Sequence, residues 1–301
     1  MSFWDIMDPV NRRTFLLSAG VTLAAPAFAP SAIAKTRDLH KAIMYATVGV
    51  KGTVLEKFQA VKAAGFEGIE PMSHMSQSEV LDAFAATGLK PASCCCATHW
   101  EKPLSDPDPA VRQAGLDGLI QALRDAKAYG ASSVLLVPAV VNKKVSPDDA
   151  WKRSQEQIRK AIPVARDLGV RIAIENVWNQ FIFTPLEAVR YVDEFETPTV
   201  GWHFDVGNSV TYGFPEQWIR ILNKRIVKLH IKEYSRSKRD KQGPSAGFQV
   251  AYMAGDDDWP AVMAALDEVG YTGWGIAEQP GGDTPEGLKT LTAGMDQIFA
   301  S

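Results

Sequence analysis

The chain has 301 residues, of which 46% are hydrophobic and 22% are charged. A chain with this much apolar side chain can form a large core, so the composition excludes an intrinsically disordered protein. The formal net charge of −3 argues against a dedicated DNA- or RNA-binding protein, which usually carries a basic excess. The three cysteines, Cys94 to Cys96, are consecutive and cannot readily bridge one another, which excludes a disulfide scaffold.

The first 34 residues have the layout of a bacterial signal peptide. Arg12 and Arg13 precede an apolar run over residues 15–29, and Ala-Ile-Ala at 32–34 is a small-x-small cleavage signal. The segment around the two arginines, NRRTFLL, resembles the twin-arginine export motif. We therefore expect residues 1–34 to be a twin-arginine signal peptide. The protein is then expected to be periplasmic or otherwise exported, with the twin-arginine machinery as a partner.

A membrane anchor is the alternative for the same segment. Ser18, Gly20 and Pro26 interrupt the apolar run, which is shorter than the ~20 residues of a membrane span. The sequence has no second stretch that is long and apolar enough to cross a bilayer. We therefore expect no stable membrane insertion after the signal peptide is removed.

From residue 41 onward, short β-type runs alternate with helical patterns. The pattern predicts eight strands: Ala42–Tyr45, Gly68–Pro71, Lys90–Cys95, Ser133–Pro138, Arg171–Glu175, Val200–Asp205, Ile226–Lys232 and Gly273–Glu278. It also predicts eight helices: Val54–Ala64, Ser78–Thr87, Pro109–Tyr129, Pro147–Leu168, Pro185–Glu194, Pro215–Leu222, Trp259–Val269 and Pro285–Phe299. Three of these helices begin with Pro behind a capping hydroxyl, at Ser146, Thr184 and Thr284.

Repeated strand–helix units indicate a parallel sheet. Eight such units in residues 35–301 match the ~250 residues of a closed barrel. A doubly wound open sheet is the competing architecture, but the sequence lacks the glycine-rich phosphate-binding turn that such a sheet usually carries. We predict an α/β fold with a single (β/α)8 TIM barrel domain over residues 35–301. The polar stretch Ser235–Gly247 is predicted to be a loop long enough to act as a flap.

Each of the last four predicted strands carries a residue that can bind a metal. Glu175 ends RIAIE, Asp205 ends GWHFD, His230 lies in VKLHIK, and Glu278 ends GWGIAE. Active sites of TIM barrels lie at the C-terminal strand ends, so these side chains should converge. Carboxylates packed together need a cation, because buried unpaired charge is costly. An oxygen-rich set with one His suits Mn²⁺ or Mg²⁺.

The segments IAIEN, HFDVGN, LHIKEYSR and IAEQ resemble the xylose-isomerase-like TIM barrels, a family of sugar phosphate isomerases and epimerases. This resemblance covers roughly residues 41–299 and includes the ketose 3-epimerases, hydroxypyruvate isomerase and inosose dehydratase. It implies that Glu175, Asp205, His230 and Glu278 bind a divalent metal, most commonly Mn²⁺, with Mg²⁺ or Co²⁺ as alternatives. It also implies that Glu175 and Glu278 are the catalytic acid and base, acting through a metal-bound enediolate.

Five further residues are candidates for substrate binding. Arg236 follows His230 by six residues, as an Arg does in the ketose 3-epimerases that the chain resembles. Those enzymes have a His where Asn208 stands, and Asn can form a hydrogen bond to a hydroxyl but cannot titrate. Glu70 ends the second predicted strand and His99 follows the third. Both are expected either to meet sugar hydroxyls or to lie in surface loops. Lys232 is expected either to bind an oxyanion or to form a salt bridge.

The predicted function is a metal-dependent sugar isomerase or epimerase. Removing a proton next to a carbonyl is slow because the resulting enolate is unstable. A metal would stabilise the enolate, and two carboxylates would remove and return the proton. Loss of a β hydroxyl from the same intermediate would give elimination, so a lyase or dehydratase acting on a 3-keto-glycoside or inosose is the alternative. A non-catalytic sugar-binding barrel is the alternative of another class. Nucleic acid is excluded as a partner, and a homo-oligomer stays open.

Overall fold

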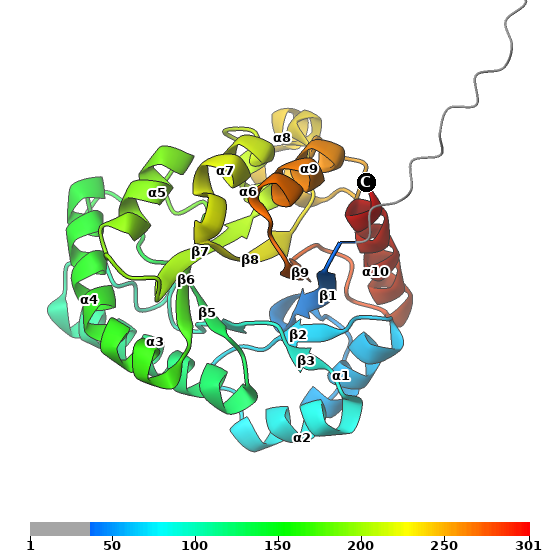
Figure 1. The fold of residues 1–301 in the computed structure, drawn as a ribbon, viewed down its shortest axis with the longest axis horizontal. Coiled ribbons are helices and arrows are strands. Elements are labelled where there is room, and N and C mark those ends of the chain that lie inside the picture. The colour runs from blue at the N-terminus through cyan, green and yellow to red at the C-terminus, as the bar shows by residue number, and fades with distance from the viewer. Residues whose placement is uncertain (1–36) are drawn as a thin grey trace, which may run out of the picture. The chain divides into compact units, whose positions relative to one another are not determined.

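A computed structural model describes residues 37–301, so the predicted signal peptide lies outside the described residues. The described residues contain nine strands in one parallel sheet, which stands at the centre of Figure 1. The order of neighbours is β3-β2-β1-β9-β8-β7-β6-β5-β4. The strands are β1 Leu39–Met44, β2 Gly68–Glu70, β3 Lys90–Pro91, β4 Cys94–Cys95, β5 Ser133–Leu136, β6 Arg171–Glu175, β7 Val200–Asp205, β8 Ile226–Ile231 and β9 Gly273–Ala277.

Strands β3 and β4 are two halves of one barrel strand. β3 pairs with β2 and β4 pairs with β5, so the two ends of the sheet meet within the segment predicted as one strand, residues 90–95. Backbone hydrogen bonds from Ala92 to Ile69 and from Cys95 to Pro71 continue the contact with the β2 side. Eight barrel strands therefore form a closed cylinder, and the predicted TIM barrel is confirmed.

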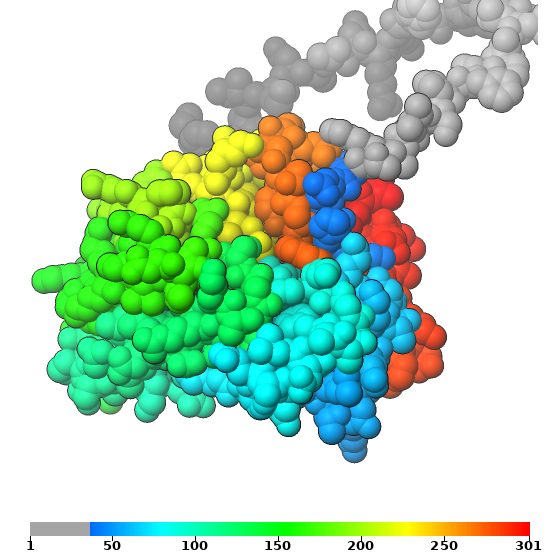
Figure 2. All heavy atoms as spheres, turned by 60° about the horizontal axis from the view of Figure 1, so that its bottom comes forward, coloured from blue at the N-terminus to red at the C-terminus, as the bar shows by residue number. Residues whose placement is uncertain are grey.

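Helices surround the barrel between successive strands, as Figure 1 shows. Ser146, Thr184 and Thr284 each accept a hydrogen bond from a backbone N–H three residues ahead, which confirms the three predicted caps. Figure 2 shows the outer face over α2 to α4, where the cyan and green segments form a continuous surface. The helices are α1 Val54–Ala63, α2 Gln77–Thr87, α3 Pro109–Tyr129, α4 Pro147–Leu168, α5 Pro185–Asp193, α6 Val206–Val210, α7 Pro215–Leu222, α8 Arg236–Gln242, α9 Trp259–Val269 and α10 Pro285–Ala300.

The predicted loop over residues 235–247 is wrong in one respect, because it contains helix α8 and the start of a 3-10 turn, η3 (Pro244–Phe248). Ser235 caps α8 by accepting a hydrogen bond from the backbone of Lys238. The run is almost entirely polar, so it shows no apolar periodicity from which a helix could be predicted. Two further 3-10 turns are η1 (Tyr45–Thr47) and η2 (Asn223–Arg225).

Alternation along each strand separates the apolar core from the barrel interior. On β6, Ile172 and Ile174 belong to the core between sheet and helices, whereas Ala173 and Glu175 point to the other side of the strand. The same alternation places His203 with Asp205 and Lys228 with His230 inside the barrel. Within residues 37–301, no helix has the length and apolar character needed to cross a membrane.

Candidate metal centre

Four ligand-type side chains converge at the C-terminal ends of β6 to β9. One donor atom from each of Glu175, Asp205, His230 and Glu278 lies within 4.8 Å of the others. Nδ1 of His230 is 3.0 Å from Oε1 of Glu175, 3.2 Å from Oε2 of Glu278 and 3.8 Å from Oδ2 of Asp205. Strand register produces this convergence, because Asp205 pairs with His230 and the latter pairs with Ile276, two residues before Glu278. The structure thus brings the four predicted ligands together.

The donor set fits a divalent cation. Asp205 and His230 are fully buried, and Glu175 is 6% exposed. Among the described residues, Oδ2 of Asp205 has no hydrogen-bond partner. A buried carboxylate oxygen without a hydrogen-bond partner is costly, and a divalent cation among these four groups would offset two of the three negative charges at once. Three carboxylates and one imidazole are also the hard, oxygen-rich ligands that Mn²⁺ and Mg²⁺ accept.

The three carboxyl groups differ in their electrostatic surroundings. Burial raises the pKa of Asp205 well above its usual value and also raises the pKa of Glu175. Burial acts in the same direction on Glu278, but the charges of Lys232 and His230 outweigh it and hold the pKa of Glu278 well below its usual value. Lys232 Nζ is the nearest of these cationic groups, since it donates to Oε2 of Glu278 at 2.8 Å.

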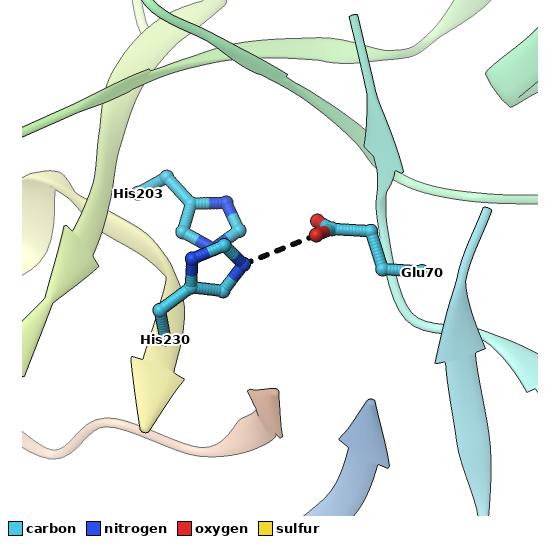
Figure 3. A group of neighbouring side chains, drawn as sticks. All are labelled: Glu70, His203 and His230. Carbon is cyan, nitrogen blue, oxygen red and sulfur yellow. Dashed lines mark hydrogen bonds and ion pairs between the residues drawn. The ribbon is translucent and has the colours of Figure 1, made fainter. Parts of the chain in front are cut away.

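The carboxylate of Glu70 contacts the imidazole of His230 on its Nε2 side. Figure 3 shows its carboxylate at the end of β2 pointing to Nε2 of His230, at 3.0 Å. Because Nδ1 of the same ring faces the other carboxylates, a proton on Nε2 that is donated to Glu70 leaves the Nδ1 lone pair free for a cation. Glu70 is fully buried and does not line the cavity described below. The structure shows its contact with His230, and its contact with sugar hydroxyls stays a prediction.

His203 lies beside this pair, and neither of its ring nitrogens has a hydrogen-bond partner among residues 37–301. Its ring packs edge-on against the ring of His230, with the centroids 4.2 Å apart. Burial lowers the pKa of His203 well below its usual value, so the ring is a neutral packing group.

A cavity of about 230 Å³ opens above the four converging side chains. Three predicted substrate-binding residues line it: His99, Asn208 and Lys232. His99 Nδ1 accepts a hydrogen bond from the backbone of Val137, and burial lowers the pKa of His99 to about 4, so its ring is neutral near pH 7. The backbone N–H of Asn208 donates to Oδ1 of Asp205 at 2.6 Å. The cavity is also lined by Met44, Cys95, Trp100, Leu135, Glu175, Val177, Trp178, Phe248 and Glu278.

Arg236 does not line this cavity. It begins α8, and its guanidinium donates to the carbonyls of Val210 and Gly213 at 3.1 and 2.9 Å. The guanidinium also stacks over the ring of Phe214, 5.4 Å from its centroid. The structure therefore shows Arg236 joining α8 to the segment after β7. Its contact with the substrate stays a prediction, and in this structure the guanidinium is held by Val210, Gly213 and Phe214.

Asn176 is a site residue that the sequence reasoning missed. Its Oδ1 accepts from the backbone N–H of Asp205 at 2.9 Å and from Nε1 of Trp202 at 3.2 Å. Its Nδ2 donates to the backbone carbonyl of Asp205 at 2.8 Å. Asn176 therefore fixes the backbone that presents Asp205. One sequence signal could have identified Asn176: it lies directly after Glu175 in IAIEN, at the end of a strand. Amide side chains are rarely buried in a core, so an Asn at this position indicates a site residue.

A buried carboxyl pair holds the segment that covers the cavity. Glu233 is fully buried, and its Oε2 accepts from the backbone of Met253 and from Nε1 of Trp259, both at 2.7 Å. Asp257 accepts from the backbone of Tyr234 at 2.8 Å and donates its own N–H to Glu233. Burial, with Glu233 next to it, raises the pKa of Asp257 well above its usual value. These contacts join the two ends of the segment that carries α8 and η3.

Asp257→Asn is expected to change the pH dependence of stability. A folded-state pKa above the unfolded value of about 3.9 means that the protonated carboxyl stabilises the fold at low pH, and that this contribution is lost as pH rises through the raised pKa. The variant keeps a neutral side chain at every pH and does not lose this contribution. As pH rises from 5 to 9, the free energy of unfolding of the variant should therefore increase relative to that of the wild type. Urea unfolding measures this difference. The control is Asp240→Asn, at an exposed position of α8, and parallel curves for wild type and Asp257→Asn would contradict the expectation.

The chain is a parallel barrel in which three carboxylates and one imidazole converge at the strand ends, a donor set that fits a divalent cation. The family model described as "Xylose isomerase-like TIM barrel" matches residues 58–296, and the chain belongs to this family. L-ribulose-5-phosphate 3-epimerase UlaE of Escherichia coli O1:K1 is 22% identical over 262 residues, which cover 80% of this chain and 89% of that protein.

Solved structures share the fold over most of their length. D-psicose 3-epimerase of Clostridium cellulolyticum H10, solved with D-tagatose, has a TM-score of 0.70 at 19% identity and covers 86% of this chain and 98% of its own. The E. coli 3-keto-D-glucoside 4-epimerase YcjR has a TM-score of 0.72 at 18% identity, covering 87% and 99%. The IolI protein with a bound zinc atom has a TM-score of 0.71 at 18% identity, covering 86% and 98%. The relatives are largely carbohydrate epimerases, which agrees with the predicted enzyme class.

Proposed function

We propose that this protein is a sugar isomerase or epimerase that depends on a divalent cation, with Mn²⁺ as the ion that its ligands suit best. One observation carries the proposal: Glu175 and Glu278 line the same cavity and lie with Asp205 and His230 around one point. A protein that only bound a sugar would not need two carboxylates facing one another. The similarity to carbohydrate epimerases supports the same reaction class.

The two glutamates divide the proton transfer between them. A divalent cation, when bound, would polarise the sugar carbonyl and its neighbouring hydroxyl and lower the cost of negative charge on the oxygens. Glu175 comes from β6 and Glu278 follows β9, so a sugar carbon between them meets one carboxylate on each side. One carboxylate removes the proton next to the carbonyl, and the other returns a proton to the opposite face, which inverts the carbon. Lys232 donates to Glu278 and favours its carboxylate form, which can accept a proton.

The other cavity residues position the sugar. His99 is neutral and therefore offers a hydrogen bond without adding charge, while Asn208 lies beside Asp205 and can meet a hydroxyl. Trp100 and Trp178 present ring surface on which a sugar ring can stack. The covering turn η3 contributes Phe248 and limits the access of water.

Glu175→Gln and Glu278→Gln are each expected to reduce turnover by about 10²–10⁴-fold, because neither amide can carry the proton. The measurement is deuterium incorporation from D₂O next to the carbonyl, followed by NMR with a panel of free, phosphorylated and 3-keto sugars and added Mn²⁺. Glu286→Gln, at an exposed position in the first turn of α10, is the control. Full activity in either site variant would refute the two-carboxylate mechanism. Net loss of water or of an aglycone would assign the protein to the lyases instead.

Glu70 is expected to control cation affinity through His230. Glu70→Leu removes the acceptor for Nε2–H and should weaken Mn²⁺ binding by about 10–100-fold, whereas Glu70→Gln keeps an acceptor oxygen and should stay close to the wild type. Competition with a fluorescent chelator measures both dissociation constants without any need for turnover. Equal affinities of the Leu and Gln variants would show that the contact with Glu70 does not support the site.

We propose that residues 1–34 direct export through the twin-arginine pathway, which carries folded proteins and would allow a cation to bind beforehand. The sequence NRRTFLL and the following apolar run support this. Replacing both Arg12 and Arg13 by Lys is expected to retain the protein in the cytoplasm of a Gram-negative host. Cell fractionation followed by immunoblotting measures the distribution, and an unchanged periplasmic fraction would refute the proposal.

A further inference from the structure

A second cavity, of about 210 Å³, adjoins the cavity above the metal centre. The two share Val177, Trp178 and Asn208 in their walls. The turn η3 covers both, because Pro244 lines the second cavity and Phe248 lines the first. The two cavities therefore lie side by side. Each volume alone is below the roughly 300–1,000 Å³ typical of small-molecule sites, and the two together fall within that range.

Four aromatic side chains line the second cavity, together with the polar Asn176, Gln180, Asn208 and Ser209. Phe183 is 46% exposed and Tyr212 is 65% exposed, and their rings meet edge to face with the centroids 5.8 Å apart. Trp218 forms part of the buried wall. Trp178 stands between the two cavities, held by a hydrogen bond from Nε1 to the carbonyl of Asn208 at 3.1 Å. Exposed aromatic rings gathered at a hollow are typical of a surface that binds an apolar group.

The charges of the lining residues limit the class of ligand that the two cavities can bind. No Lys, Arg or His side chain lines the second cavity. In the first cavity, Lys232 is already paired with Glu278, and His99 is neutral near pH 7. A phosphate group usually needs free cationic donors, most often Arg or Lys, and the described lining residues of both cavities offer none. The two cavities therefore favour a substrate that is neutral and has one polar part and one apolar part.

We propose that the second cavity is a subsite for the aglycone of a neutral glycoside, with a flat aromatic aglycone lying between Trp178 and the pair Phe183–Tyr212. The sugar ring of the same molecule lies over the metal centre. The inference deepens the proposed function and rests on it for the place of the sugar. It assigns the substrate class as aryl glycosides whose sugar ring carries a ketone, because the proposed proton transfer needs a carbonyl, in preference to free or phosphorylated sugars.

Binding of substrates that cannot react tests the subsite separately from catalysis. Phenyl and methyl β-glycosides of glucose and of galactose have no carbonyl, so they need only bind. Isothermal titration calorimetry with the Mn²⁺-loaded protein should show the phenyl glycosides binding about tenfold more tightly than their methyl counterparts. The double variant Phe183→Ala/Tyr212→Ala should lose this preference without a change in methyl glycoside affinity. Leu186→Ala, at a 69% exposed position in α5 outside both cavities, should keep it.

Three results would overturn the proposal. Equal affinity for phenyl and methyl glycosides, or no measurable binding of either, would show that the cavity does not receive an aglycone. A preference that survives in the double variant would place the aglycone elsewhere. Tighter binding of cellobiose than of phenyl glucoside would make the cavity a second sugar subsite. A failure of the proposed reaction would appear instead as absent deuterium exchange, with the phenyl preference intact.

Discussion

The site depends on holding three carboxyl groups close together against their mutual repulsion. Glu175, Asp205 and Glu278 all approach Nδ1 of His230, and most of this group is shielded from water. A flexible loop would separate such groups, because repulsion and desolvation both oppose their approach. Here each side chain projects from, or directly follows, a strand whose backbone hydrogen bonds leave it little freedom. The closed sheet therefore supplies the rigidity that a site of this charge requires.

Polar contacts around the four ligands complete this arrangement. Asn176 fixes the backbone of Asp205 on both sides, and Glu70 holds the far nitrogen of His230. Lys232 offsets part of the negative charge through Glu278. Each contact crosses from one strand end to another, so the orientation of a ligand depends on several strands at once. The segment that covers the cavity is held by a different set of contacts, through Glu233 and Asp257. The residues of this segment can therefore differ in chemistry from the four converging side chains.

The two cavities differ in their chemistry, and this difference fits the proposed division between reaction and selectivity at one barrel end. The floor of the first cavity is ionic and comes from strands, whereas the wall of the second is aromatic and comes largely from the segments that follow β6 and β7. Proton transfer needs fixed charges, and recognition of a remote group needs only complementary surface. Trp178 lines both cavities and lies three residues after Glu175, the last residue of β6.

The sequence by itself determined the eight strand–helix units and the four side chains that converge at the strand ends, because strand alternation, helix caps and polar residues at strand ends are local signals. It did not reveal α8, whose polar residues have no apolar period, nor the consequent turn of Arg236 toward Val210 and Gly213. Only the tertiary structure decided that Glu70 supports His230 instead of meeting the cavity, and that Asn176 orients Asp205. These contacts join residues far apart in the chain, so their partners are set by barrel closure and strand register, which no local pattern encodes.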